Sequence, residues 1–122
     1  MDGVLVDSER VSLAEDHDFF AELFGKDVAD KIGDAMGIGI DEVYQKAVAA
    51  GASMDKALYL QKSDERCASI YARAGLIEGS DRLAAYLTSH GYKLGLVSAT
   101  PRKWIDHVLA RLKFGEKIEA VV

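Results

Sequence analysis

Hydrophobic residues recur at helical spacing over the first part of the chain, from residue 8 to residue 75. A helix is predicted over residues 8–24, because Ser8 is a residue type favoured at helix N-termini and Gly25 is one favoured just past helix ends. Glycine-bearing turns separate three further predicted helices, over residues 26–36, 41–50 and 53–74. Helices joined by such short turns indicate a small helical bundle.

The periodicity changes after residue 75. Ser80 is the predicted N-cap of a helix over residues 80–90, and Pro101 starts another helix. Apolar runs predict two strands, at residues 94–97 and 118–122, with a strand fragment at residues 4–6. Alternating helices and strands indicate an α/β fold with a parallel sheet. Two strands and a fragment are less sheet than a complete domain of this class needs.

Length and charge narrow the classes of partner. The 122 residues fit about one domain by the rule of roughly 150 residues per domain. With 15 basic and 20 acidic residues, the net charge of −5 gives no broad attraction to nucleic acid or to an anionic membrane. Cys67 is the single cysteine, which excludes an internal disulfide and favours a reducing compartment. No apolar run reaches membrane-spanning length, and the first residues do not resemble a signal peptide. We therefore expect a cytoplasmic protein.

A run of ionisable residues lies inside the first predicted helix, at Glu15, Asp16, His17 and Asp18. Side chains adjacent in a helix point in different directions, so they do not converge on one metal ion. We interpret this run as an exposed acidic turn of the helix.

A hydroxyl residue ends the predicted strand at residues 94–97. Ser98 is followed by Ala99 and Thr100, and Pro101 takes the first helical position, where its missing N–H has no intrahelical partner to lose. The Ser98 hydroxyl and nearby N–H groups would then face the space beyond the strand's carboxyl end. Ligands of open α/β sheets bind there, and a helix N-terminus attracts anions. From these residues alone, phosphate binding competes with the plainer interpretation that Thr100 only caps the helix.

Two carboxylates flank a short apolar run at the N-terminus, in the segment Asp2-Gly3-Val4-Leu5-Val6-Asp7-Ser8-Glu9. Gly3 permits an unusual backbone turn beside Asp2. Taken by itself, this segment is interpreted as a hairpin-like start with exposed acids.

Together the two segments resemble the haloacid dehalogenase (HAD) superfamily. Its opening motif is an apolar strand followed by Asp-x-Asp-Gly-Val-(apolar)-x-Asp-Ser-Glu, which residues 2–9 match from the second aspartate onward. Its next motif is an apolar strand ending in Ser or Thr, like residues 94–98. The closest similarity is to the phosphatase and β-phosphoglucomutase-like branch. The resemblance implies a partial Rossmann-like α/β core, residues 1–8 and 76–122, with an inserted helical-bundle cap, residues 9–75.

The resemblance also implies roles for single residues. Asp2 matches the aspartate that acts as general acid and base, and whose backbone carbonyl is a magnesium ligand in the family. Ser98 matches the hydroxyl that orients the transferring phosphoryl group, assisted by the backbone N–H of Ala99. Fixed donors and a cation suit this chemistry because negative charge develops on the phosphoryl oxygens. The implied activity is that of a HAD-type phosphatase, which hydrolyses a small phosphorylated metabolite through an aspartyl-phosphate with Mg²⁺.

Several residues of the family pattern have no counterpart in the sequence. The nucleophilic aspartate precedes Asp2 by two positions, whereas the sequence begins one position before Asp2. A lysine and then an acidic pair should follow beyond Val122, and Lys113 and Lys117 come too early to match that lysine. We therefore expect a piece of such an enzyme, cut inside the core on both sides, that does not turn over substrate.

Two alternatives to a phosphatase stay open. One is a β-phosphoglucomutase-like phosphomutase, although Ser12 stands where those members commonly have histidine. The other is a non-catalytic helical fragment that binds a partner. An incomplete sheet exposes apolar surface and unpaired strand edges. Self-association through this sheet is therefore expected as well.

Overall fold

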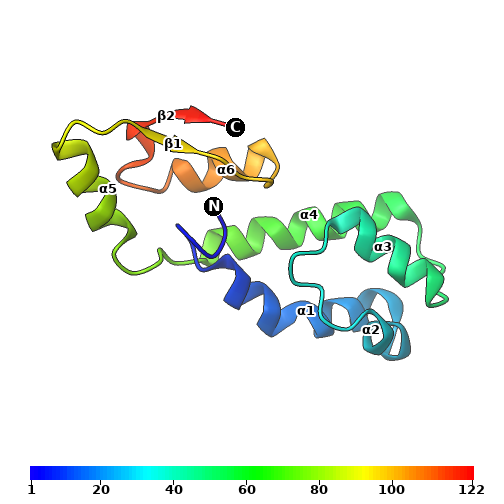
Figure 1. Ribbon diagram of the computed structural model, residues 1–122. Coiled ribbons are helices and arrows are strands. Elements are labelled where there is room, and N and C mark those ends of the chain that lie inside the picture. Colours follow the sequence, from blue (N-terminus) through cyan, green and yellow to red (C-terminus); the bar gives the residue numbers. More distant parts are fainter. The chain divides into compact units, whose positions relative to one another are not determined.

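The computed structural model describes residues 1–122, which form two compact units. The first, here called the α/β unit, comprises Met1–Ser8 and Tyr71–Val122, and the second, the helical unit, comprises Glu9–Ile70. The elements in chain order are α1 (Ser8–Phe24), α2 (Lys26–Ile32), α3 (Ile40–Ala49), α4 (Lys56–Arg73), α5 (Ser80–Ser89), β1 (Leu94–Leu96), α6 (Arg102–Leu109), the 3₁₀ helix η1 (Gly115–Lys117) and β2 (Ile118–Val121) (Figure 1). The helices and the strand pair confirm the predicted α/β class.

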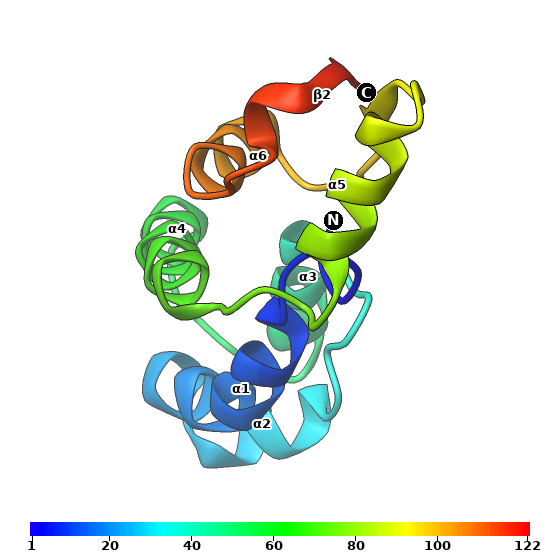
Figure 2. The ribbon, with the colours of Figure 1, turned by 90° about the vertical axis from the view of Figure 1, so that its left-hand side faces the viewer.

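The helical unit has a core of its own. Its buried members are Phe20, Val28, Ala29, Ile32, Val43, Ala47 and Tyr59. Tyr59 of α4 is 2% exposed, its ring lies 5.3 Å from that of Tyr44, and its hydroxyl donates a hydrogen bond to the carbonyl of Ile40 at 3.0 Å. Burial raises the pKa of the Tyr59 hydroxyl, because the ionised form would lose its hydration. Figure 2 views α4 nearly along its axis.

No helix combines the length and apolarity that a membrane crossing requires.

An arginine of α4 joins that helix to α1. The Arg66 guanidinium pairs with the Asp16 carboxylate and donates to the carbonyl and the hydroxyl of Ser12, at 3.0 and 3.2 Å. Its charged group also lies over the Phe19 ring, 4.7 Å from the centroid. The Arg66 and Asp16 side chains are only 16% and 14% exposed. The prediction of an exposed acidic turn is therefore wrong for Asp16.

Glycines move two helix ends away from their predicted positions. α2 ends at Ile32 instead of residue 36, because Gly33 leaves the helix with φ 65°. Gly79, with φ 85°, is the N-cap of α5, where Ser80 was predicted. The Ser80 hydroxyl instead donates to the carbonyl of Ile77 at 2.8 Å. Positive φ is readily available to glycine alone, and this decides both ends.

The sheet of the α/β unit has two parallel strands, β1 and β2. The register pairs Leu94 with Ile118 and Leu96 with Val121, with an irregularity after Leu94. Pairing extends past both strands, since the Val122 N–H donates to the Leu96 carbonyl at 2.8 Å and the Ser98 N–H donates to the Val122 carbonyl at 2.9 Å. The carboxyl end of β1 therefore leads directly into the segment before α6.

The N-terminal segment is a tight turn, so the predicted strand fragment at residues 4–6 is wrong. Gly3 has φ 64°, and its N–H donates to the Val6 carbonyl at 2.9 Å. The Leu5 N–H donates to the Met1 carbonyl at 2.8 Å. Two further bonds join this turn to residues 75–77, from the N–H of Asp7 and to the carbonyl of Leu5. Strand-like pairing is limited to the isolated bridge between Val6 and Leu76, and the other bonds of the segment close the turn itself.

The last turn of α4 belongs to the α/β unit. The Arg111 guanidinium donates to the carbonyl of Tyr71 and to that of Ala74, the latter at 3.4 Å. Carbonyls at a helix C-terminus lack intrahelical partners, and an arginine supplies the missing donors. The Tyr71 ring stacks on Trp104 of α6 at 5.6 Å between centroids. Trp104 thus has a packing role.

Candidate functional site

The Asp2 carboxylate accepts hydrogen bonds from two hydroxyl groups of the α/β unit. Ser8 donates to Oδ1, and Thr100 donates to Oδ2 at 2.6 Å. Hydrogen bonds from hydroxyl groups to ionised carboxylates are short and strong. Both carboxylate oxygens are therefore held in place by side chains from distant parts of the sequence.

Ser98 joins the same group of side chains through Thr100. Its hydroxyl donates to Thr100 Oγ1 at 2.9 Å and accepts the Thr100 N–H at 3.3 Å. The amino group of Met1 lies 3.5 Å from Ser98 Oγ. We call Asp2, Ser8, Ser98 and Thr100 the hydroxyl cluster. A continuous chain of donors runs through it from Ser98 to Thr100 and on to Asp2.

Local sequence places each member of the cluster. The turn at Gly3 brings Asp2 back over the start of α1, where Ser8 is the first helical residue and is 4% exposed. Ser98 and Thr100 follow the carboxyl end of β1, and Pro101 is the N-cap of α6. Proline cannot donate a backbone hydrogen bond and its φ of −52° suits the turn into a helix. The cluster therefore lies where a strand end, a helix start and the N-terminal turn meet.

The structure brings Asp2 and Ser98 together and places Ala99 between Ser98 and Thr100 on the exposed surface. Sequence reasoning missed the contacts of Ser8 and Thr100 with Asp2, because it treated both residues as helix caps. A usable signal was present. Ser8 is a hydroxyl residue inside the first motif and the first residue of α1, and Thr100 is a hydroxyl residue two positions after Ser98 and just before α6.

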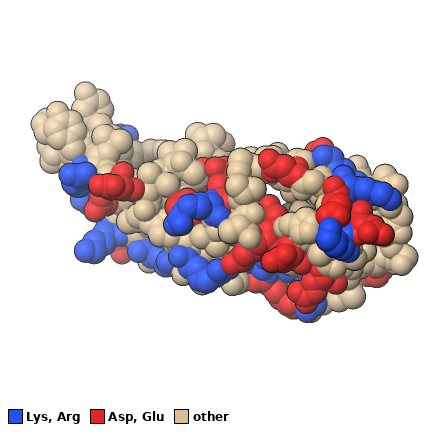
Figure 3. All heavy atoms as spheres, turned by 90° about the horizontal axis from the view of Figure 1, so that it is seen from below, with Lys and Arg blue, Asp and Glu red and all other residues tan.

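Charge is unevenly divided between the two units. The helical unit has 13 of the 20 acidic residues and 7 of the 15 basic ones, so the α/β unit has 7 acidic and 8 basic residues. On the face seen in Figure 3, acidic side chains gather on the part drawn at the right. The nearest cations that follow the cluster are engaged, since Arg102 bonds Asp106 at 2.8 Å and Lys103 lies over the Trp104 ring at 4.9 Å. Neither of these two side chains is therefore directed to an anion at the cluster.

The residues of the cluster do not form a magnesium site by themselves. Mg²⁺ requires nearly octahedral coordination by oxygen. Across residues 1–122 no group of three or more His, Cys, Asp or Glu side chains is placed to hold a metal ion. The family resemblance assigns only the backbone carbonyl of Asp2 to magnesium, which is a single ligand, and Asp2 has the one carboxylate of the cluster. Asp2 alone therefore does not fit the role of a complete ion-binding site.

A protein-family model matches the chain. The model of a family described as haloacid dehalogenase-like hydrolase matches residues 1–122. No curated protein matches the chain. The match spans both parts of the α/β unit and so includes every residue of the hydroxyl cluster.

Proposed function

The chain belongs to the haloacid dehalogenase-like hydrolase family, and from this premise we propose that it serves the hydrolysis of a small phosphate monoester. The observation that carries the proposal is the chain of hydroxyl donors from Ser98 through Thr100 to Asp2. This chain of hydrogen bonds links the Ser98 hydroxyl, which can bind phosphoryl oxygens, to the Asp2 carboxylate, which can accept and donate a proton. The general hydrolase role follows from the family, and the phosphate substrate is the proposal.

Ser98 and the backbone N–H groups that follow it would hold the phosphoryl oxygens. These donors lie at the carboxyl end of β1 and before α6, where unpaired helical N–H groups favour an anion. Preorganised donors stabilise the charge that develops on these oxygens as the ester bond breaks. To bind them, the Ser98 hydroxyl would rotate away from Thr100, its present acceptor.

Asp2 would move the proton. A carboxyl group fixed near the ester oxygen can give that oxygen a proton as the alcohol leaves, and its carboxylate can then take a proton from the attacking water. Ser8 and Thr100 restrict the rotation of the Asp2 side chain, because each bonds a different carboxylate oxygen. They are positioning residues for this transfer.

The family pattern also implies a nucleophilic aspartate and a magnesium ion, and no reaction step is assigned to either. The nucleophilic aspartate would stand two positions before Asp2, outside residues 1–122. A dependence on Mg²⁺ would need ligands in addition to Asp2. The steps proposed for residues 1–122 are therefore the binding of the phosphoryl oxygens and the movement of a proton.

Titration of the ¹⁵N-labelled chain with inorganic phosphate tests the proposal. The amide resonances of residues 98–100 should shift, and Ser98→Ala should weaken binding by about tenfold, because one hydrogen bond to a charged group is lost. Ser89→Ala is the matched control, since Ser89 is exposed at the end of α5 and its hydroxyl bonds the Tyr86 carbonyl.

One outcome would contradict the proposal. Equal phosphate binding by the wild type and by Ser98→Ala would remove Ser98 from the phosphate site.

A further inference from the structure

Asp2 and Gly3 form the one Asp-Gly pair of residues 1–122, and these residues include no asparagine. An aspartate followed by glycine rearranges its backbone more readily than other aspartates, because glycine has no side chain to obstruct attack on the neighbouring carboxyl group. Asparagine is the other residue type that rearranges in this way. Spontaneous rearrangement of the chain should therefore concentrate at Asp2.

The rearrangement needs no reagent besides water. The Gly3 nitrogen attacks the side-chain carboxyl carbon of Asp2, and the new C–N bond closes a five-membered succinimide ring. The amide hydrogen and the carboxyl hydroxyl group leave together as water. A second water molecule then opens the ring at either of its two carbonyls. One opening restores aspartate, and the other gives isoaspartate, whose backbone runs through the former side chain.

The structure restrains the group that is attacked. The Asp2 carboxylate accepts hydrogen bonds from Ser8 at Oδ1 and from Thr100 at Oδ2. Ring closure removes one of these two oxygens and leaves the other as an uncharged carbonyl oxygen. It therefore breaks one of the two hydrogen bonds and weakens the other, and hydrogen bonds to a charged group are among the stronger ones in a protein. The ring is reached only through local opening of the hydroxyl cluster.

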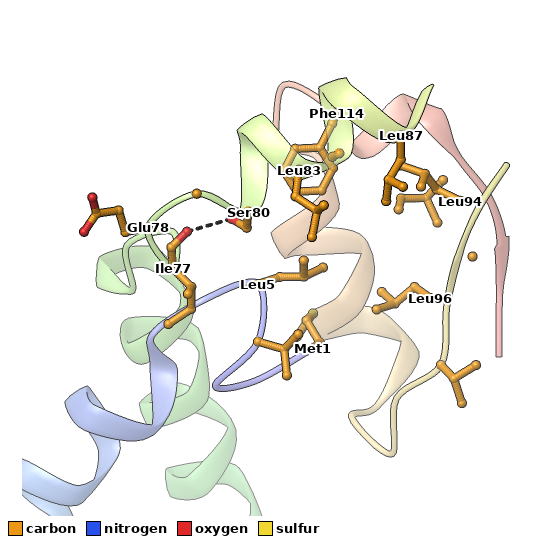
Figure 4. A pocket seen from close by; sticks show the side chains of 16 residues that line it. Met1, Leu5, Ile77, Glu78, Ser80, Leu83, Leu87, Leu94, Leu96 and Phe114 are labelled. Atoms are coloured by element: carbon orange, nitrogen blue, oxygen red, sulfur yellow. Dashed lines mark hydrogen bonds between the residues drawn. The ribbon is translucent and has the colours of Figure 1, made fainter. Parts of the chain in front are cut away.

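The structure also restrains the attacking nitrogen. The Gly3 N–H donates to the Val6 carbonyl at 2.9 Å, and this bond holds the hydrogen that the attack must release. The turn that contains Gly3 is itself held in place, because the Leu5 carbonyl accepts the Ile77 N–H at 3.0 Å. In Figure 4 the Leu5 side chain extends from the turn into an apolar pocket that Leu96 of β1 also lines. Both reacting groups are therefore fixed by the fold.

We propose that Asp2 is a site of spontaneous isoaspartate formation, and that the hydroxyl groups of Ser8 and Thr100 slow this reaction in the folded chain, with or without a substrate. Thr100 supplies the bond that depends on tertiary folding, since it lies 98 positions from Asp2, whereas Ser8 lies six positions away. Protection should therefore fall when the Thr100 hydroxyl is removed, even in a chain whose helices remain folded.

Isoaspartate at this position would disable the hydroxyl cluster. It lengthens the backbone by one carbon atom and shortens the side chain by one, so the carboxylate no longer stands where Ser8 and Thr100 bond it. These two hydroxyl groups thus preserve the residue that they bond. A stored preparation of the chain should lose the cluster at the rate of this one reaction.

Storage of the purified chain at neutral pH and physiological temperature tests the proposal. Trypsin releases residues 1–10, which end at Arg10, and mass spectrometry with fragmentation that distinguishes isoaspartate from aspartate gives the rate of conversion at Asp2. The wild type should convert at least about tenfold more slowly than a synthetic peptide of residues 1–10. Thr100→Val should convert about tenfold faster than the wild type, because loss of a hydrogen bond to a charged group shifts an equilibrium by about that factor.

Two variants serve as controls, and both should convert at the rate of the wild type. Thr88→Val removes a hydroxyl group of the same unit that bonds the carbonyls of Ala84 and Ala85 within α5. Arg66→Ala removes the pair with Asp16 in the helical unit and leaves the hydroxyl cluster intact. It separates protection by the Thr100 hydroxyl from protection by general stability.

Three results would overturn the proposal. The first is equal conversion in the wild type and in the free peptide, which would show that the fold gives no protection. The second is equal conversion in Thr100→Val and in the wild type. The third is a rise in either control variant as large as the rise in Thr100→Val, because protection would then follow the stability of the whole chain and not the hydroxyl group.

Discussion

Thr100 has more contacts within the hydroxyl cluster than a helix-capping residue needs. It donates to Asp2, accepts from Ser98, and its own N–H returns to the Ser98 hydroxyl. Its hydroxyl therefore connects a carboxylate near the N-terminus to the end of β1. The stability of this part of the α/β unit should depend on that single oxygen atom.

Replacement of Thr100 by valine tests this dependence. Thr100→Val keeps the size of the side chain but removes one bond to the Asp2 carboxylate and the acceptor of Ser98, so the free energy of unfolding should fall by about 1–3 kcal/mol. Thr100→Ser retains the hydroxyl and should recover most of the loss. Urea unfolding measures both. Equal stability of Thr100→Val and the wild type would show that the hydroxyl stabilises nothing.

At the hydroxyl cluster, the sequence suggests candidate residues but does not predict the hydrogen bonds between them. The segments at residues 2–9 and 94–98 led to the selection of Asp2 and Ser98, because their order and chemistry match two family motifs, and the roles of these two residues stay predictions. The contacts of Ser8 and Thr100 could not be predicted in the same way. Which acceptor a hydroxyl group bonds depends on what tertiary folding brings near it, and both residues have a plausible local role as helix caps.

Arg66 determines how two helices of the helical unit are joined. Its guanidinium bonds Asp16 and Ser12 of α1 from its position on α4, in surroundings where both charged side chains are largely buried. Loss of one member of such a pair leaves the other charge buried without compensation.

Substitution of Arg66 should therefore be costly. We expect Arg66→Ala to lower the free energy of unfolding by about 3 kcal/mol, because Asp16 would keep its charge without a partner. Lys62→Ala is the control on the same helix. Lys62 pairs with Glu65 at 3.1 Å, both side chains are about half exposed, and the loss should stay below about 0.5 kcal/mol. Thermal or urea unfolding compares the two variants. Similar losses of stability for Arg66→Ala and Lys62→Ala would contradict the stabilising role given to the pair of Arg66 and Asp16.

Element types were easier to predict than element ends and partners. The periodicity of apolar residues located the α-helices, since burial of one face needs that spacing, but it did not predict the 3₁₀ helix η1. It failed at residues 4–6, where an apolar run predicted a strand but the turn at Gly3 uses the backbone groups internally. It also failed for Asp16, because a run of ionisable residues does not reveal a basic partner 50 residues away.

The two units differ in how completely they enclose apolar side chains. The helical unit has a continuous core around Tyr59, whereas the α/β unit has a pocket beside β1 and a sheet of two strands. Two-stranded sheets are marginal without further cover. The predicted division of the chain at residues 8 and 75 stays a prediction about domains.

Local opening should follow this difference. In hydrogen exchange of the monomeric chain, amides around Val43 and Ala47 should exchange more slowly than those of β1 and β2, by about an order of magnitude or more. The reason is that opening the sheet exposes few buried side chains. Exchange at equal rates in both units would show that the chain opens as a single cooperative unit.

The family and the fold class are the predictions that the comparisons confirm. The resemblance of two short segments was enough, and the family match extends it to residues 1–122. Neither segment indicates which substrate the protein binds. Substrate choice depends on the shape and polarity of a binding surface, and such a surface is assembled from side chains that are remote in sequence.

The bond between Thr100 and Asp2 joins residues 98 positions apart. Closing so long a loop costs chain entropy, and the contacts within helices form without that cost. The hydroxyl cluster is therefore expected to assemble late in folding, after the helices and after β1 has met β2. A ribosome that has not yet released the segment around Thr100 holds a chain whose Asp2 still lacks one of its two donors.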